Sequence, residues 1–335
     1  MSGGSGRSGG SRRSSGSRDR RAELLLGALA VGVLALIALM VVVVFTKAWP
    51  SFAHNGLDWF GSGGDADVQL KAMVQNTPLP GHSIYYFRAW PLIWGTLLTT
   101  GLAVLIGLIF STFAAVFIVE FAPDSLRRVL DPVVRLLAAV PSVVYGLVGI
   151  LAIAPWVEHH LISQQRKHSV DFVVQLTGAN LGVATLILTV MITPIMVAIT
   201  SRSLATVPRS WTEGSAALGV NRWRTTWRVS LRTARPAIIA GAVLATARAL
   251  GEAIMLSMVS GSRGFAANPL DGVTFAFEPV RPLAATIIDY IDGLSVKPLA
   301  QTLYAMAAVL LVSSALLSLA GWAAKQPLKK YGIRA

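Results

Sequence analysis

Two opposite charges lie in one of the most apolar stretches of the chain. Arg248 and Glu252 belong to the segment ATARALGEAIM, residues 245–255. Residues four apart share one face of a helix, so the two side chains are predicted neighbours. A charge at the centre of a membrane-spanning helix costs ~3 kcal/mol, and apolar residues would stabilise the packing as well or better. The pair is therefore predicted either to mark a solute pathway or to fix helix packing as an Arg–Glu pair.

The chemistry of this pair suits an oxyanion. A guanidinium presents a fork of N–H donors that matches two oxygens of a tetrahedral anion at once. The Glu252 carboxylate could hold the arginine in place, or accept a hydrogen bond from a protonated anion such as hydrogen phosphate. Small residues around the pair allow neighbouring helices to approach closely; they are Ala245, Ala247, Ala249, Gly251 and Ala253. The segment is therefore expected at the centre of a helix bundle.

The composition is that of a membrane protein and excludes several kinds of site. Of the 335 residues, 54% are hydrophobic and 13% are charged, whereas soluble domains carry about a quarter charged residues. The chain has no cysteine, which excludes disulfides, thiolate metal sites and cysteine nucleophiles. The adjacent His159 and His160 lack the spacing of a metal site, and neither a metal site nor a catalytic residue is predicted. No G-x-x-x-x-G-K-[ST] loop is present, so no cofactor is expected here, and ATP and Mg²⁺ would bind a separate ATPase.

Apolar runs predict six membrane-spanning helices. About 20 apolar residues cross the ~30 Å hydrocarbon layer as a helix. Pro141 and Pro194 interrupt two of the runs, which neighbouring helices can tolerate. The expected fold class is all-α integral membrane with six transmembrane helices. The predicted spans are Leu24–Thr46, Leu92–Val119, Leu136–Trp156, Leu181–Thr200, Ala237–Ser260 and Leu299–Ala320.

The distribution of basic residues predicts the orientation of the chain. With a cytoplasmic N-terminus, the inward segments hold 20 of the 29 Lys and Arg residues and the outward segments hold 8. This is the positive-inside pattern, and it predicts a multi-pass protein of the plasma membrane with both termini cytoplasmic. It also explains the net charge of +13 without a nucleic-acid partner. The inward segments are 1–23, 120–135, 201–236 and 321–335, and the outward segments are 47–91, 157–180 and 261–298.

These segments define the expected organisation. Residues 1–23 are expected to be a disordered basic tail that reaches lipid headgroups. The first apolar run is too long for the core of a signal peptide, so 24–46 is interpreted as a retained helix. An external loop (47–91), a permease core with five helices (92–320) and a cytoplasmic tail (321–335) follow.

The longest inward segment, 201–236, carries helical signals rather than the composition of a linker. Ser210 or Thr212 is predicted to cap a short helix that Gly219 ends. A second helix is expected from Asn221 to about Thr233, and Pro236 is expected to open the fifth span. The arginines of the second helix fit lipid phosphates. A short helix between two spans also fits a lever on which a cytoplasmic partner docks.

This loop and four other motifs resemble a known family. Glu213 followed by Gly219 six residues later resembles the EAA…G loop of ABC-importer permeases. The stretches LAAVPSVVYGLVGI (137–150), WPLIWGTLLTT (90–100), FIVEFAP (117–123) and RALGE (248–252) resemble the PstC-type permease of the high-affinity phosphate importer. Gly214 departs from the alanine that is usual in the loop and weakens its helix by up to ~1 kcal/mol.

The resemblance implies a fold, partners and roles for residues. The implied fold is the type I ABC importer permease (MetI-like), a non-enzymatic subunit that moves phosphate by alternating access. The implied partners are a second permease subunit (PstA-like), two copies of a cytoplasmic ATPase (PstB-like) and an external phosphate-binding protein (PstS-like). A role in translocation is implied for Arg248, Glu252, Pro141, Ser142 and Tyr145. ATPase coupling is implied for Glu213, Gly214, Ser215, Ala216, Ala217, Leu218 and Gly219.

Three alternatives stay open. The same architecture could carry another oxyanion, such as sulfate or molybdate. A proton-coupled secondary transporter could use Glu252 as its proton carrier. A membrane signalling scaffold could report phosphate status, alongside transport.

Overall fold

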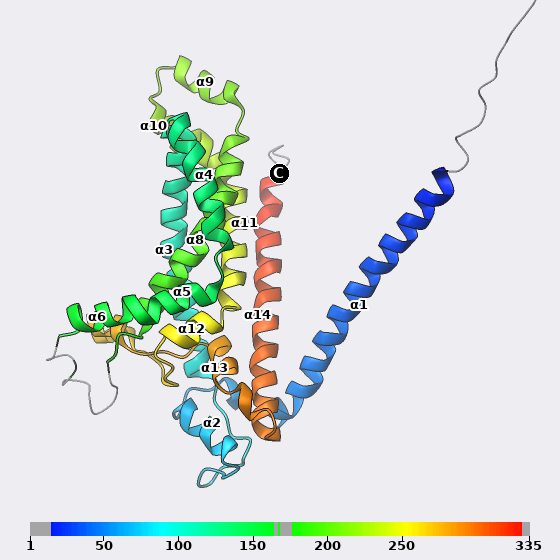
Figure 1. Cartoon of the computed structure of the whole chain (residues 1–335), viewed down its shortest axis with the longest axis vertical. Helices are drawn as coiled ribbons and strands as arrows, with labels where there is room; N and C mark the ends of the chain where they lie inside the picture. Colours follow the sequence, from blue (N-terminus) through cyan, green and yellow to red (C-terminus); the bar gives the residue numbers. More distant parts are fainter. Residues whose placement is uncertain (1–14, 164–166, 168–175, 330–335) are drawn as a thin grey trace, which may run out of the picture. The chain divides into compact units, whose positions relative to one another are not determined.

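A computed structural model describes residues 15–163, 167 and 176–329 as helices joined by loops (Figure 1). The chain divides into two compact units, Met1–Lys47 and Ala48–Ala335, which are described separately. The α-helices are α1 (Ser15–Asn55), α2 (Ala66–Val74), α3 (Trp90–Val116), α4 (Asp124–Ala139), α5 (Ser142–Val148), α6 (Ala154–His160), α8 (Leu181–Ala205), α9 (Arg209–Ala217), α10 (Arg222–Thr225), α11 (Leu231–Leu250), α12 (Ile254–Val259), α13 (Leu283–Asp289) and α14 (Lys297–Lys329). Short 3-10 helices are Gly56–Phe60, Pro269–Phe277 and Ile291–Gly293, and π-helical turns are Phe117–Phe121, Gly149–Ile153 and Thr226–Ser230.

The first unit consists of the greater part of α1. Most of its large apolar side chains between Leu24 and Phe45 are exposed, as suits a helix surrounded by lipid. The helical segment Ala22–Phe60 is long and apolar enough to span a membrane. Because α1 begins at Ser15, the prediction of a disordered tail is wrong for residues 15–23, and residues 1–14 lie outside the described part.

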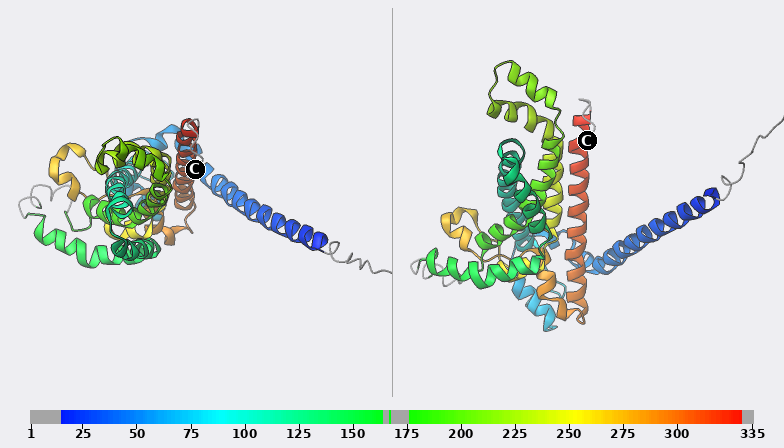
Figure 2. Two further views of the ribbon diagram at one scale, coloured as in Figure 1. Left: turned by 90° about the horizontal axis from the view of Figure 1, so that it is seen from above. Right: turned by 45° about the horizontal axis from the view of Figure 1, so that its top comes forward.

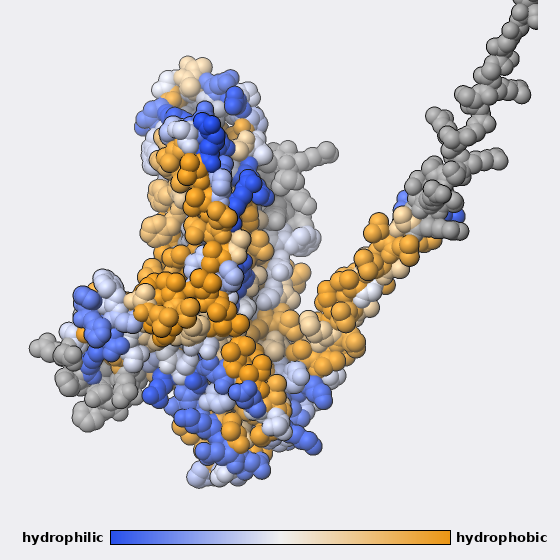
Figure 3. Space-filling model, viewed as in Figure 1, coloured by the Kyte–Doolittle hydropathy of each residue, from blue (hydrophilic) through white to orange (hydrophobic). Residues whose placement is uncertain are grey.

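Four long helices of the second unit, α3, α8, α11 and α14, run side by side (Figures 1 and 2). α8 is central, since α3, α4 and α11 all pack against it and Leu188, Met191 and Ile192 are buried. Lipid is as apolar as these side chains, so close packing rather than removal from water stabilises the bundle. Figure 3 shows hydrophobic surface over the middle of the bundle and hydrophilic surface near α9 and near α2. We call these two regions the α9 end and the α2 end.

The third predicted span does not begin at Leu136. Residues 136–139 belong to α4, and the backbone turns at Val140 and Pro141 before α5 begins. Proline disfavours a helical backbone at the residue before it, and Val140 is accordingly extended, with ψ of 130°. The segment Ser142–His160 is apolar enough to span a membrane. It runs across the axes of α3 and α8 rather than along them (Figures 1 and 2).

The fifth predicted span, Ala237–Ser260, is wrong as a single helix. α11 ends at Leu250 and α12 begins at Ile254, so the helix is broken between them. Pro236 lies inside α11 rather than at its start. Within the described residues, five helices are long and apolar enough to cross a membrane, and neither α11 nor α12 is among them. The prediction of six spans is therefore corrected to five long apolar helices and one broken pair.

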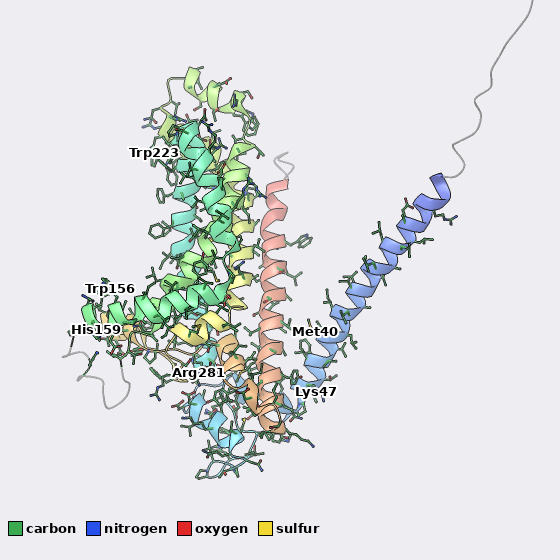
Figure 4. The ribbon with its side chains drawn as sticks, in the orientation of Figure 1. Met40, Lys47, Trp156, His159, Trp223 and Arg281 are labelled. Atoms are coloured by element: carbon green, nitrogen blue, oxygen red, sulfur yellow. The ribbon has the colours of Figure 1, made fainter. Side chains whose placement is uncertain are left out.

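A buried ionic network around Arg281, which lies near the α2 end (Figure 4), joins segments that are far apart in the sequence. Arg281 forms ion pairs with Asp67 of α2 and with Asp289 of α13, where Nε lies 3.3 Å from the carboxylate. Asp67 also accepts the backbone N–H of Gly264 at 2.8 Å, and the Ser257 hydroxyl of α12 donates to Asp289. Buried charges persist when opposite charges and hydrogen bonds surround them. The network therefore fastens α2 and α13 to α12.

Another carboxylate, Glu278, is buried in the loop between α12 and α13. Burial, with a smaller contribution from the neighbouring Asp271, raises the pKa of Glu278 to about 7, although the backbone N–H of Asn268 donates to its carboxylate. The carbonyl of Glu278 accepts the N–H of Leu181, the first residue of α8, at 2.9 Å. This loop therefore packs on the start of the central helix, and its stability depends on protonation.

We predict that this loop is held more firmly at pH 5 than at pH 8. An unfolded glutamate has a pKa of about 4.3, so the folded loop is stabilised by protonation at low pH. That stabilisation is lost as the pH rises through about 7. Backbone hydrogen exchange of peptides from residues 268–281, corrected for its intrinsic pH dependence, should increase between pH 6 and pH 8. Glu278→Gln should abolish the increase, whereas Asp58→Asn, at an exposed carboxylate, should preserve it. If exchange in Glu278→Gln increased with pH as it does in the unsubstituted protein, Glu278 would not be the group that destabilises the loop.

Candidate functional site

Glu252 stabilises the break between α11 and α12. The last helical bonds of α11 run from the Gly251 N–H to the Ala247 carbonyl and from the Glu252 N–H to the Ala249 carbonyl, at 3.4 and 3.3 Å. The Glu252 side chain is 9% exposed, and its carboxylate accepts the N–H of Met255 at 3.2 Å. The first N–H groups of any helix lack partners within that helix. Glu252 therefore acts at the start of α12 as capping side chains do.

Arg248 lies in the last turn of α11, half-buried, where the helix ends. Among the described residues, no carboxylate oxygen lies within 4.0 Å of its guanidinium. The predicted Arg248–Glu252 pair on one helix face is therefore wrong, because the helix ends at Leu250 and Glu252 turns toward α12. A cation in the last turn of a helix is stabilised by the negative end of the helix dipole. The site thus presents a guanidinium whose N–H donors are not taken up by a carboxylate.

Tyr145 links the predicted third-span residues to Arg248. The Tyr145 hydroxyl interacts electrostatically with the Arg248 guanidinium, and its ring packs on the buried cluster formed mainly by α8, α11 and α12. The hydroxyl donates to the carbonyl of Leu137 at 2.9 Å and so bridges the turn between α4 and α5. Pro141 and Ser142 form this turn, one helical turn before Tyr145. The structure therefore places Tyr145 within electrostatic range of Arg248, with Ser142 on the same short helix and Pro141 directly before it.

Two glycines allow the segment from α5 into the following π-helical turn to approach α8 and α12. A Cβ at Gly146 would lie 2.9 Å from Sδ of Met258 and 3.1 Å from Cα of Met255, and a Cβ at Gly149 would overlap the side chain of Ile187. Carbon atoms pack best at about 3.5–4.0 Å, so a side chain at either position would push the segment away. Close approach at these glycines keeps Tyr145 beside the α11–α12 break.

The predicted coupling residues lie at the α9 end, away from this break (Figure 1). α9 contains Glu213, Gly214, Ser215, Ala216 and Ala217, and none of its residues is buried. Leu218 follows the helix, and Gly219 adopts a φ of +76°. Glycine enters this left-handed region without steric cost, which confirms the prediction that Gly219 ends the helix.

The start of α9 differs from the prediction. The helix begins at Arg209, directly after Pro208, so a cap at Ser210 or Thr212 is wrong. Trp211 and Leu218 leave apolar surface exposed, 48% and 84% respectively.

The helix after α9 begins where predicted and then continues into α11. Asn221 caps α10, accepting the N–H of Arg224 at 2.8 Å. A π-helical turn then joins α10 directly to α11, so no boundary occurs at Thr233. Trp223 lies at this end, whereas Trp156 and His159 lie on α6 (Figure 4). The α9 end is therefore connected to Arg248 by one helical path.

Comparison with known proteins identifies the kind of molecule that has this arrangement. Residues 107–325 match the family model described as "binding-protein-dependent transport system inner membrane component". This chain belongs to that family. It is 32% identical over 255 residues to the probable ABC transporter permease protein YqgH of Bacillus subtilis (strain 168), covering 76% of this chain and 77% of that protein. It is also 32% identical over 235 residues to the probable phosphate transport system permease protein PstC of Methanocaldococcus jannaschii, covering 69% and 70%.

The fold is confirmed by a solved structure. A bacterial alginate ABC transporter, in complex with an alginate pentasaccharide-bound periplasmic protein, contains a chain that matches with a TM-score of 0.56. The match covers 93% of this permease and 98% of that chain at 15% identity, so it bears on the fold and not on the solute. The permease is a multi-pass inner-membrane transport subunit and not an enzyme. Membership of this family implies a partner permease, an ATPase and a binding protein, and it removes the proton-coupled secondary transporter as an alternative.

Sequence reasoning missed two features of this permease. The first is the break at 251–253, for which Gly251 itself was a weak signal. The second is the pairing of Asp67 with Arg281, which no local pattern indicates because 214 residues separate them. In the described part of the chain, no three His, Asp or Glu side chains are grouped to hold a metal ion.

We predict that Gly146→Val destabilises the permease. The new side chain would meet the Met255 backbone, which cannot rotate away as the end of a side chain can. Overpacking of this kind costs about 1–3 kcal/mol, measurable as a shift in the unfolding of the purified protein in detergent. Gly101→Val in α3 is the matched control, because a Cβ there meets nothing within 4 Å. Equal destabilisation by the two substitutions would contradict close packing at Gly146.

Proposed function

We propose that this permease forms half of the translocation pathway of an ATP-driven importer of inorganic phosphate, and that Arg248 meets the anion. The observation that carries the proposal is the Arg248 guanidinium at the helix break, within electrostatic range of the Tyr145 hydroxyl and with no carboxylate within 4.0 Å in the described structure. Similarity to PstC permeases supports phosphate as the solute.

The proposed binding chemistry uses donors rather than acceptors. A guanidinium has five N–H donors and no acceptor, and two parallel bonds to one phosphate add both strength and specificity. Ser142, near the same turn, would add a neutral donor, whereas the single O–H of Tyr145 is already donated to the Leu137 carbonyl. Glu252 would not hold Arg248; it would stabilise the break through its bond to Met255 and disfavour a fully deprotonated anion by its charge.

The proposed partners follow the family. A second, PstA-like permease would complete the pathway, two PstB-like ATPases would bind ATP and Mg²⁺, and a PstS-like protein would deliver phosphate from outside. In this arrangement both termini and α9 face the cytoplasm. The ATPases would move the segment from Glu213 to Gly219, and the continuous path through α10 and α11 would carry that movement to Arg248. The site would then open alternately to the two sides.

Another tetrahedral oxyanion is the main alternative, because sulfate or molybdate presents similar oxygens to Arg248. Uptake of labelled phosphate in the presence of a hundredfold excess of sulfate or molybdate separates the two cases. Phosphate import predicts little competition, whereas strong inhibition by sulfate or molybdate would reject phosphate as the main solute.

We predict that Arg248→Gln abolishes phosphate uptake while the transporter still assembles. Loss of charge-assisted hydrogen bonds to a bound anion weakens binding by about tenfold or more. Uptake in whole cells measures the effect, and co-purification of the other subunits checks assembly. Arg232→Gln, at an exposed position of the same helix, should keep normal uptake. Normal uptake in Arg248→Gln would remove this residue from the pathway.

We also predict that Glu213→Lys weakens association with the ATPase without unfolding the permease. Glu213 is exposed on α9 and lines a cavity of about 380 Å³ with Thr212, Ala216 and Arg222. Charge reversal there would disturb docking of the ATPase on this cavity. Asp124→Lys, an equal reversal at the exposed start of α4, is the control. Undiminished co-purification of the ATPase and unaltered uptake in Glu213→Lys would reject the coupling assignment.

A further inference from the structure

A basic cavity lies between α4 and α8, on residues that the proposed translocation site does not use. Its volume is about 200 Å³, several times the ~30 Å³ that a water molecule occupies in the liquid. α4 contributes Arg127, Asp131 and Arg135, whose spacing of four residues places them on one helix face. α8 contributes Ser201 and Arg202, and the remaining walls are apolar. The cavity belongs to the part of α8 that leads to the α9 end.

The charges around this cavity are not balanced. Three guanidinium groups face one carboxylate, which leaves two positive charges without a counterpart in the lining. The ion pair between Arg127 and Asp131 is long, at 3.9 Å, and partly exposed. Arg135 and Arg202 form no ion pair in the described part of the chain. Positive charges gathered around one cavity repel each other and attract an anion.

Ser201 gives a second, independent indication of a ligand. Its Oγ is buried and has no hydrogen-bond partner among the described residues. Serine in a helix commonly bonds the carbonyl four residues earlier, yet no such bond is made here. A buried hydroxyl without a partner is costly, and an oxyanion or a water in the adjacent cavity would satisfy it. A hydroxyl next to several guanidinium groups is the donor set that a phosphate group requires.

We propose that the α4–α8 cavity is a second oxyanion site, which binds a phosphate group through Arg127, Arg135, Arg202 and Ser201. The phosphate group has two sources, the headgroup of an anionic lipid or inorganic phosphate in solution. Either would bridge α4 to α8. Because α4 leads through Pro141 into α5, a bridged α4 would hold the segment that carries Tyr145.

The test uses the full-length chain purified with the subunits that co-purify with it. Arg135→Gln/Arg202→Gln removes two cavity charges, and Arg128→Gln, a neighbour on α4 outside the cavity lining, is the matched control. One arm measures phosphatidylglycerol retained by the detergent-solubilised protein, using native mass spectrometry. The other arm measures binding of inorganic phosphate to delipidated protein in the Arg248→Gln background, so that the proposed translocation site does not contribute. Ser201→Ala, with little effect expected on folding, is tested in both arms.

We expect the double substitution to weaken the binding of one of the two ligands by about tenfold or more relative to Arg128→Gln. Ser201→Ala should weaken the binding of the same ligand by a smaller factor. A change confined to the first arm identifies a lipid headgroup, and a change confined to the second identifies inorganic phosphate. Equal binding of both ligands by the double variant and Arg128→Gln would overturn the proposal. This result is separate from the uptake test of Arg248, which does not depend on the α4–α8 cavity.

Discussion

A helix break, stabilised by one buried carboxylate, is the feature on which the rest of this permease depends. Between Gly251 and Ala253 the backbone leaves the helix, and in a membrane an N–H group without a partner is costly. Glu252 offsets this cost by accepting the N–H of Met255 at 3.2 Å. Because the break is stable, the Arg248 end of α11 and the beginning of α12 meet at one place, and Gly146 of α5 packs against Met255 there.

The two halves of the broken helix are held at different ends of the bundle. α12 is bonded through Ser257 to Asp289, and Arg281 extends this network to Asp67 of α2. α11 instead continues through the π-helical turn and α10 toward α9. In the proposed transport cycle, movement of α9 reaches Arg248 along a helical path, whereas α12 stays fastened to the α2 end. The displacement would then be concentrated at the break, beside the proposed anion site.

α4 connects the bundle to the same place by a second route. Its polar face meets α8 around the basic cavity, while apolar side chains such as Val129 and Leu136 are exposed, at 60% and 69%. Exposed apolar side chains on a membrane protein suit lipid or a partner subunit. α4 passes through the turn at Pro141 into α5, and the Tyr145 hydroxyl bonds back to Leu137 across that turn. A ligand on α4 would therefore be connected through this turn to the helix that carries Tyr145.

The amino-acid sequence by itself determined the features that depend on local composition. Apolar length alone locates five long helices within the described residues, and Gly219 ends α9 because glycine tolerates a φ of +76°. It also determined the family, since the motifs that resemble ABC-importer permeases lie in the matched region. Only the tertiary structure decided that Arg248 and Glu252 are separated by a break rather than paired on one face. One hydrogen bond at the break is supplied by the Glu252 carboxylate, and α12 packs against Gly146, a residue more than 100 positions away. The pairing of Asp67 with Arg281 likewise depends on contacts between distant segments, which no local pattern of residues specifies.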